Sequence, residues 1–287
     1  MTEADARNAG QIDVWNGSSG EQWVLQQERM DAVLAPVSSA LFAVADVQPG
    51  MHVLDIGCGC GDTTLEIARR VGSAGRVLGV DISVPMLARA RERTPAGAPV
   101  AFIEADATTY ALPAADADLL LSRFGVMFFA DPVAAFANMR QGLKSGGRVA
   151  FACWRPIETC PWMTVPLKAA RSIVPADPNA PPADPDAPGP QAFARAERVQ
   201  SILAAAGFAD IALDAVDLTV DLAGGKGLTG AIEGALYVGP VSRVMRDQPP
   251  DVKARATDAL RTALTPYVRG ETVPLGAGIW IVTARNP

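Results

Sequence analysis

The chain has 287 residues and a formal net charge of −6, from 25 Lys and Arg against 31 Asp and Glu. With 49% hydrophobic and 20% charged residues, the composition excludes an intrinsically disordered chain and a coiled coil. The acidic balance argues against a protein held on nucleic acid by a basic surface. No apolar run reaches about 18 residues and the start of the chain is polar, so we expect no membrane span, no signal peptide and a cytoplasmic location.

The cysteine and histidine content argues against a disulfide framework and a metal site. The four cysteines stand at 58, 60, 153 and 160, without a C-x-x-C pair, and His52 is the single histidine. We interpret the cysteines as small packing residues, because no cation at a fixed spacing marks a lowered thiol pKa. His52 opens the first expected strand, at the end opposite the ligand edge of such sheets, so we expect no catalytic role for it.

The region before residue 47 is expected to be helical. Apolar side chains recur at helical spacing over 20–46, and Pro36 interrupts them. Proline suits the first turn of a helix better than its interior, so we predict two consecutive helices here.

Between residues 47 and 154, short apolar runs alternate with helical patterns. Ser83 and Asp131 are the expected N-caps of two of these helices, and the helix after Asp131 is expected to stop at Gly146-Gly147. The expected strands are 51–56, 76–81, 100–105, 117–122 and 147–154. This alternation predicts a mostly parallel sheet covered by helices on both faces.

The pattern changes after Trp154. Residues 175–190 contain seven prolines and three aspartates, which predicts an exposed loop. A helix ending at Gly207 follows, and then a strand at 211–222 that is expected nearer the sheet edge. The remaining expected elements are helical stretches at about 228–247 and 250–268 and a last strand at 279–285.

The most informative segment is the glycine-rich loop after the first strand. Gly57, Gly59 and Gly61 alternate with cysteines, so backbone N–H groups can approach a ligand that any Cβ would keep away. Asp81 ends the next strand, where its two oxygens can accept from both hydroxyls of a ribose. Together these features predict a nucleoside cofactor.

The loop does not fit a dinucleotide. The G-x-G-x-x-G fingerprint fails in both registers, because its sixth position is Asp62 or Thr64. An acid at 62 also places negative charge at the helix N-terminus that a pyrophosphate needs. No tyrosine is followed by lysine four residues on, which further disfavours an NAD(P)-dependent reductase.

On the segments VLDIGCGCG, VLGVDIS, EADA and LKSGGRVAF, the chain resembles the class I S-adenosylmethionine-dependent methyltransferases, in particular the small-molecule group that includes the ubiquinone and menaquinone C-methyltransferases. The resemblance covers 51–154 well and extends loosely to WNGSSGEQW and IWIVTAR. It implies a Rossmann-like, doubly wound α/β fold whose seven-stranded sheet has an antiparallel last strand. It also implies S-adenosylmethionine as cofactor and S-adenosylhomocysteine as product.

The resemblance also implies roles for individual residues. Asp55 and the loop would line the methionine moiety, Asp81 would hold the ribose, and Asp106 would accept from the adenine amino group. Ile82 and Met86 would flank the adenine, and Ser122 would lie near the sulfonium. The full set expected to bind the cofactor is Asp55, Gly57, Cys58, Gly59, Gly61, Asp81, Ile82, Met86, Asp106, Ala107 and Ser122.

The sequence says less about the methyl acceptor. The segment after the fourth strand, from Ser122 to Met127, lacks the [N/D]-P-P-[Y/F/W] motif of methyltransferases that act on amino groups of nucleic acids and glutamine. With the acidic charge, this favours a small-molecule acceptor. Residues that follow strands four and five are candidates to contact it, either as cations for an anionic or carbonyl group or as aromatic walls: Arg123, Phe124, Trp154 and Arg155.

We therefore expect four parts: an N-terminal helical lid (1–46), the cofactor-binding core (47–154), a proline-rich lid insertion (155–195), and a segment that completes the sheet (196–287) with a helical insertion at 223–270. Methyl transfer is an in-line displacement that positioning and exclusion of water can accelerate. The alternatives are a catalytically silent nucleoside-binding protein of the same fold and an NAD(P)-dependent reductase. No catalytic residue can be assigned from the sequence.

Overall fold

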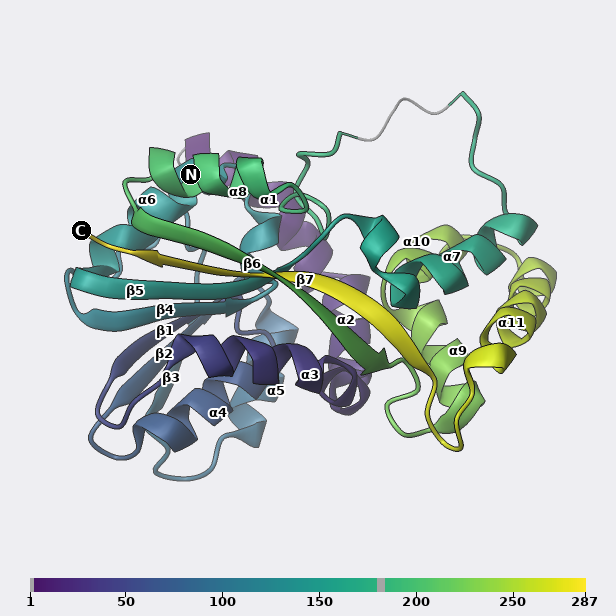
Figure 1. The fold of residues 1–287 in the computed structure, drawn as a ribbon, viewed down its shortest axis with the longest axis horizontal. Helices are drawn as coiled ribbons and strands as arrows, with labels where there is room; N and C mark the ends of the chain where they lie inside the picture. Colours follow the sequence, from purple (N-terminus) through teal and green to yellow (C-terminus); the bar gives the residue numbers. More distant parts are fainter. Residues whose placement is uncertain (1–2, 180–183) are drawn as a thin grey trace.

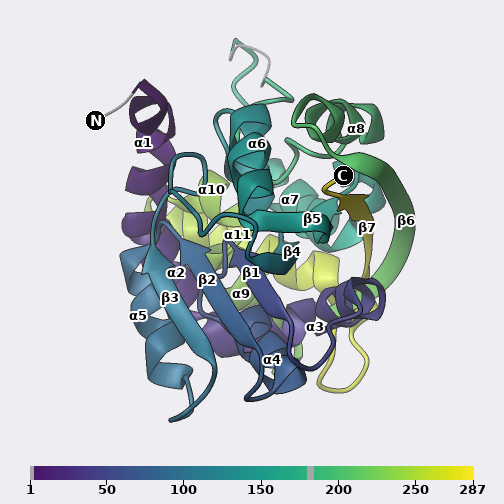
Figure 2. The same cartoon turned by 90° about the vertical axis from the view of Figure 1, so that its left-hand side faces the viewer.

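The computed structural model describes residues 3–179 and 184–287. Its centre is a seven-stranded sheet with strand order β3-β2-β1-β4-β5-β7-β6 (Figures 1 and 2). The strands are β1 (His52–Ile56), β2 (Arg76–Asp81), β3 (Val100–Glu104), β4 (Ala117–Arg123), β5 (Leu143–Trp154), β6 (Ala209–Asp221) and β7 (Pro274–Arg285). The pairs among β1 to β5 are parallel, whereas β7 is antiparallel to both β5 and β6.

Helices cover both faces of this sheet (Figure 1). On one side lie α3, α4 and α5, and on the other α6 and α8. Beyond the carboxyl ends of β4 and β5, the helices α7, α9, α10 and α11 form a separate group. The helices are α1 (Glu3–Asn16), α2 (Ser18–Leu25), α3 (Gln27–Ala45), α4 (Asp62–Val71), α5 (Val84–Arg93), α6 (Pro132–Gly142), α7 (Pro161–Ile173), α8 (Ala196–Ala205), α9 (Gly227–Tyr237), α10 (Pro240–Met245) and α11 (Pro250–Leu264), with short 3-10 turns η1 (Gly125–Phe128), η2 (Ile157–Thr159) and η3 (Thr265–Tyr267).

The strand order fixes where a ligand can bind. From β1 the chain proceeds to β2 and β3 on one side, and then returns to place β4 and β5 on the other. In such sheets ligands bind outside the carboxyl ends of the strands where the order reverses. Here that point lies between β1 and β4, directly at the glycine-rich loop.

This architecture confirms the predicted Rossmann-like α/β fold and the antiparallel last strand. The second strand has its predicted bounds, and the predicted edge strand β6 lies at the edge of the sheet. Both predicted N-caps form, with Ser83 Oγ accepting from Met86 N at 3.5 Å and Asp131 Oδ1 from Ala134 N at 3.0 Å. No helix in the described ranges is long and apolar enough to cross a membrane.

The prediction of two helices around Pro36 is wrong, because α3 runs through the proline. A proline inside a helix removes one backbone hydrogen bond and costs about 3 kcal/mol. Buried side chains on both sides of it, among them Leu34, Val37 and Leu41, are at most 2% exposed. Burial of each such side chain contributes about 1.5 to 3 kcal/mol, which offsets the cost. The helix break falls instead near Gln26, between α2 and α3.

Three further boundaries differ from the sequence-based predictions. The helix after Asp131 ends at Gly142, and β5 starts at Leu143 rather than at Gly147, because Leu143 already pairs with Ala117 of β4. The stretch 228–247 forms two helices, since Gly239 adopts φ +93° between them. Helix α7 lies in a segment for which we predicted no element. Within the proline-rich 175–190, residues 180–183 lie outside the described ranges.

Candidate functional site

The glycine loop between β1 and α4 is shaped by close backbone approaches. Gly57, Gly59 and Gly61 all have positive φ, at 67°, 53° and 82°, a region that side chains disfavour. A Cβ at Gly57 would lie 2.5 Å from the Cα of Gly125 in the neighbouring η1 turn, and one at Gly59 would lie 2.8 Å from Met86 Cε. The backbone therefore forms a cradle that only glycine permits.

Asp55 is the second-last residue of β1, just before this loop, and its carboxyl is fully buried. Its Oδ2 accepts from the hydroxyls of Thr63 (2.7 Å) and Thr64 (2.6 Å) in the first turn of α4, whereas its Oδ1 has no hydrogen-bond partner. Burial raises the pKa of Asp55 to about 6, against the lowering effect of the two threonines. A buried acceptor without a donor carries an energetic cost, so Oδ1 offers a position for a donor group of a ligand.

Asp81 ends β2, next to the loop. Its Oδ2 accepts from the backbone N–H of Gly59 at 2.7 Å, and its Oδ1 accepts from that of Ser83 at 2.9 Å. Burial raises the pKa of this carboxyl, opposed by these backbone donors. Each oxygen keeps a free lone pair for a ligand hydroxyl, and the two backbone bonds fix the carboxylate in orientation.

Asp106, after β3, has a partner that the sequence did not predict. Its Oδ1 accepts from Thr108 N at 2.8 Å, and its Oδ2 accepts from Asn8 Nδ2 of α1, also at 2.8 Å. The Asn8 side chain is buried, and its Oδ1 lacks a hydrogen-bond partner. An amide of the chain thus uses one acceptor position of the carboxylate that the resemblance assigns to the adenine amino group, and each oxygen keeps a further lone pair.

Asn16 at the end of α1 contacts the same side of the site. Its Nδ2 donates to the Ile82 carbonyl at 2.9 Å, and its Oδ1 accepts from Val84 N at 2.8 Å. Ser83 Oγ in turn donates to the Trp15 carbonyl at 2.7 Å. Neither Asn8 nor Asn16 was singled out in the sequence, because their partners lie about 70 to 100 residues away and no local spacing signals the contact. The loose resemblance over WNGSSGEQW was the only signal, since it includes Asn16.

The other predicted cofactor-site residues surround the loop. Met86 is buried and touches Gly59, and Ala107 is buried beside Asp106. Ser122 Oγ donates to the Ile56 carbonyl at 2.7 Å, which ties β4 to the end of β1. Cys58 is buried, with its sulfur facing Gly79 of β2. The fold thus brings the predicted set together, while the contact of each residue with a cofactor stays a prediction.

The loop and its carboxylates fit a cationic nucleoside. Burial raises the pKa of the Cys58 thiol, and the negative charges of Asp81 and Asp55 raise it further. A third carboxylate, Asp62, stands at the start of α4. A positively charged ligand relieves this repulsion, whereas a pyrophosphate would increase it. The glycine cradle supplies the close approach, and Asp55 Oδ1 supplies an acceptor without a partner.

The aromatic candidates for the acceptor site form one cluster. Phe124 stacks on Trp154 with ring centroids 4.0 Å apart, and Trp154 contacts Trp162 of α7 at 5.1 Å. Phe124 has φ +70°, an uncommon conformation for a bulky residue. Since Gly125 packs against Gly57, this cluster lies directly beside the glycine loop.

The two arginines are held by carboxylates of the chain. Arg123 Nη1 pairs with Asp62 Oδ2 at 2.6 Å and donates to Ser38 Oγ at 2.7 Å, so it joins α3 to the start of α4. Arg155 pairs with Asp217 of β6 at 2.7 Å. Their contact with an acceptor stays a prediction.

The four cysteines and His52 lie where the sequence analysis expected them, the cysteines in packed positions and the histidine at the start of β1. All four thiols are free and buried, and burial raises the pKa of each. His52 lies at the start of β1, with Nδ1 3.6 Å from Asp116 Oδ1. His52 therefore lies at the amino ends of the parallel strands, whereas the glycine loop lies at their carboxyl ends.

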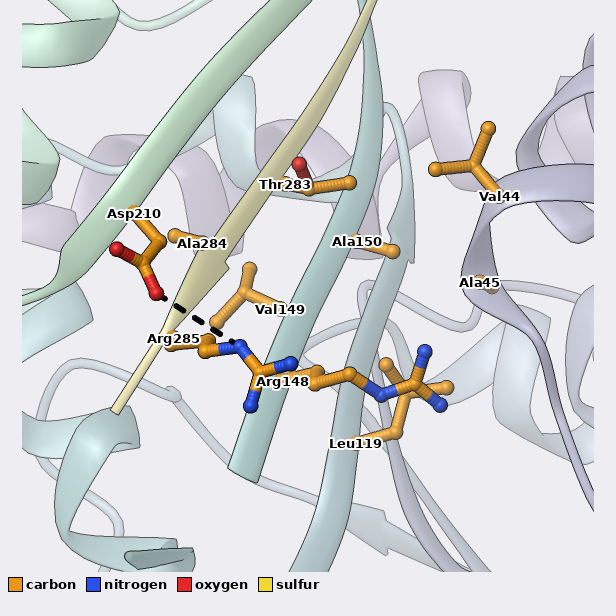
Figure 3. A pocket seen from close by; sticks show the side chains of 10 residues that line it. All are labelled: Val44, Ala45, Leu119, Arg148, Val149, Ala150, Asp210, Thr283, Ala284 and Arg285. Atoms are coloured by element: carbon orange, nitrogen blue, oxygen red, sulfur yellow. Dashed lines mark ion pairs between the residues drawn. The ribbon is translucent and has the colours of Figure 1, made fainter. Parts of the chain in front are cut away.

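A hollow of about 190 Å³ lies away from the glycine loop, toward the amino ends of β4 and β5 (Figure 3). Arg148 and Arg285 flank it, and Arg285 Nε is 3.8 Å from Asp210 Oδ2. Because it lies at the amino ends of β4 and β5, it takes no part in the site at the glycine loop.

The chain is similar in sequence to known methyltransferases. Residues 53–147 match the methyltransferase domain family. Aklanonic acid methyltransferase DauC of Streptomyces sp. (strain C5) is 38% identical over 118 residues, which are 40% of this chain and 54% of that protein. Demethylmenaquinone methyltransferase of Staphylococcus aureus (strain MRSA252) is 35% identical over 103 residues, which are 36% of this chain and 43% of that protein. The chain thus spans about half the length of these curated relatives.

Among solved structures, phosphoethanolamine N-methyltransferase 2 of Haemonchus contortus in complex with S-adenosyl-L-methionine aligns with a TM-score of 0.56. The alignment covers 96% of this chain and 59% of that one, at 17% sequence identity. At this identity the likeness concerns the fold, which is the Rossmann-like fold of S-adenosylmethionine-dependent methyltransferases.

Proposed function

We propose that the protein transfers a methyl group from S-adenosylmethionine to a small-molecule acceptor, and the match of residues 53–147 to the methyltransferase domain family supports this. The observation that carries the proposal is that Asp55 and Asp81, from neighbouring parallel strands, both lie at the glycine loop, with Asp106 following the next strand of the sheet. A free acceptor at Asp55 Oδ1 and the acidic surroundings support a cationic cofactor. The named methyltransferases among the relatives support the same chemistry.

In this proposal the cofactor supplies an electrophilic methyl group on a sulfonium. Asp55 and the loop residues hold its amino-acid end, Asp81 accepts from the ribose hydroxyls, and Asp106 accepts from the adenine amino group. Ile82 and Met86 flank the base, and Ser122 lies on the acceptor side. The chain contributes position and exclusion of water, which suffice to accelerate an in-line displacement with a good leaving group.

The proposal includes a small-molecule acceptor bound beside Phe124 and Trp154, with Arg123 and Arg155 as further candidates. The net charge of −6 supports a small molecule over a nucleic acid. The four free thiols support the expected cytoplasmic location, because disulfides form mainly in oxidising compartments.

Transfer of a labelled methyl group tests the proposal. The protein is incubated with methyl-¹⁴C S-adenosylmethionine and a panel of quinols, phenols, carboxylic acids and amines, and both extracted label and S-adenosylhomocysteine are measured. We expect equal amounts of labelled product and S-adenosylhomocysteine with at least one acceptor. The variant Asp81→Ala should lose this turnover, whereas Asp214→Ala, an exposed carboxylate on β6, should keep it.

Binding of the cofactor without turnover over the whole panel would favour the silent nucleoside-binding protein.

A second pair of variants tests the role of the two arginines. If Arg123 or Arg155 faces the acceptor, its substitution by glutamine raises the acceptor KM and leaves the affinity for S-adenosylmethionine unchanged.

A further inference from the structure

A second hollow, of about 500 Å³, lies where the end of α2, the start of α3, α5 and α9 meet. Its volume is within the range of small-molecule pockets. It shares no lining residue with the cofactor site described above. Nothing so far assigns it a role.

The hollow is lined by a buried arginine that forms no ion pair with the described part of the chain. Arg29 of α3 is 5% exposed. Its Nε donates to Gln26 Oε1 at 3.0 Å, its Nη1 to the Leu222 carbonyl at 3.2 Å, and its Nη2 to a methionine sulfur at 3.5 Å. Within the described ranges no carboxylate lies within ion-pair distance of it. A guanidinium has five N–H donors, so two remain for a ligand.

Two glycines make room for this guanidinium. A Cβ at Gly234 of α9 would collide with Arg29 Nη1, and one at Gly224 would lie 2.7 Å from Arg29 Cγ. Gly230, one turn earlier on α9, lines the hollow itself. The glycine face of α9 therefore admits the arginine head group and leaves space beside it.

The charges around the hollow favour an anion at its buried end. Glu92 is paired with Arg89 at 3.3 Å, which leaves Glu28 and Glu233 as the carboxylates of the rim. Both are exposed to solvent, which screens their charge, whereas Arg29 is buried and screened little. Burial lowers the pKa of Arg29, opposed by the charge of Glu233.

A chain of contacts joins the hollow to the glycine loop. Arg89 Nε donates to Gln27 Oε1 at 3.1 Å, and Gln27 Nε2 donates to Asp31. Asp31 pairs with Arg93 at 2.8 Å, and Arg93 Nη1 donates to the Cys60 carbonyl at 2.7 Å. These four contacts connect the rim of the hollow with the backbone of the glycine loop.

We propose that this hollow is an anion-binding subsite, in which the Arg29 guanidinium binds a carboxylate or phosphate group of the methyl acceptor. The anion itself follows from Arg29 and its surroundings, and only its assignment to the acceptor rests on the proposed function. A planar guanidinium fork matches both kinds of oxyanion through two parallel hydrogen bonds. Burial of a cation without a counter-ion is costly, and a bound anion removes that cost.

Titration calorimetry with simple probes tests the subsite without cofactor. Benzoate and phenyl phosphate present the two oxyanions, and benzamide is the neutral control of the same shape. We expect at least one anion to bind roughly tenfold more tightly than benzamide, since hydrogen bonds to charged groups are stronger than those between neutral groups. The anion that binds identifies the source of the negative charge.

The key variant is Gln26→Glu, which supplies Arg29 with a carboxylate of the chain. Because it replaces a neutral contact by an ion pair at 3.0 Å, we expect it to fold, to raise the Tm and to lose at least roughly tenfold in anion affinity. Gln200→Glu on the exposed face of α8 adds the same charge elsewhere and should leave binding unchanged.

The proposal is overturned if neither anion binds better than benzamide, or if Gln26→Glu binds the anion as tightly as the wild type. These results are independent of methyl transfer. Anion binding at Arg29 in a protein that transfers no methyl group would leave the subsite standing and refute the assignment to the acceptor.

Discussion

At the scale of single residues, the candidate site depends on carboxylates held in unusual surroundings. Asp55 is fully buried, with one oxygen bound by two threonine hydroxyls and the other without a partner. Asp81 is fixed by two backbone N–H groups. The position of Asp81 at the end of a strand singled it out in the sequence, whereas Asp55 was named through the family resemblance. The sequence could not reveal the free oxygen of Asp55, which depends on the position of α4 after folding.

The buried Asp55 predicts a pH dependence of stability in the absence of ligand. Its pKa is about 6 in the folded state against 3.8 for an ordinary aspartate, so between these values the folded state binds more protons than the unfolded state. Stability therefore falls as pH rises from about 4 to 6, by about 3 kcal/mol for this shift, and is constant above it. Urea unfolding of the wild type and Asp55→Asn should show the variant gaining relative stability over this interval. A stability difference that is independent of pH would contradict the buried, protonated carboxyl.

A matched pair of glycines separates backbone strain from cofactor binding. Gly59 and Gly270 have similar positive φ, 53° and 60°, but a Cβ meets Met86 at the first and nothing within 4 Å at the second. Alanine at either position should cost about 1 kcal/mol in unfolding free energy. Only Gly59→Ala should also weaken binding of S-adenosylhomocysteine, measured by calorimetry. Equal affinities of the two variants would show that the cradle does not contact the cofactor.

At the scale of elements, the parallel core was predictable and the helices around it were less so. The strands β1 to β4 follow short apolar runs bounded by turn residues, and their predicted positions agree with the structure within two residues. Helix α3 did not follow the local proline signal, because its buried side chains outweigh the lost hydrogen bond. The early start of β5 depends on the pairing of Leu143 with Ala117 of β4, which no local pattern can reveal.

Helix α1 is expected to hold the loop after Asp81 in place and so to slow release of the cofactor. Asn16 holds both the Ile82 carbonyl and the Val84 amide, which follow Asp81 directly. Loss of this side chain should loosen the loop, so Asn16→Ala should release S-adenosylhomocysteine several-fold faster, as one or two hydrogen bonds of about 1 kcal/mol predict. Val14→Ala removes an exposed side chain of the same helix and serves as the control in stopped-flow measurements. An unchanged release rate in Asn16→Ala would mean that α1 does not close the site.

At the scale of the whole molecule, the grouping of the candidate donor-site residues was predictable from the sequence, whereas the surroundings of the candidate acceptor residues were not. The residues proposed to bind the cofactor come from consecutive strand ends, so their order along the chain encodes their position in space. The acceptor side is assembled from distant segments, such as Phe124 and Trp154 with α7. Arg29 illustrates the same limit, since its environment comes from the residues around Leu222 and from α9, almost 200 residues away.

The measurement that tests the central claim most directly is calorimetric titration with S-adenosylmethionine and S-adenosylhomocysteine, with NAD as the control ligand. We predict binding of micromolar order, about −8 kcal/mol, for both sulfur nucleosides, loss of that binding in Asp81→Ala, and its retention in Asp214→Ala. Binding of NAD alone, or of none of the three ligands, would contradict the assignment of the glycine loop to S-adenosylmethionine.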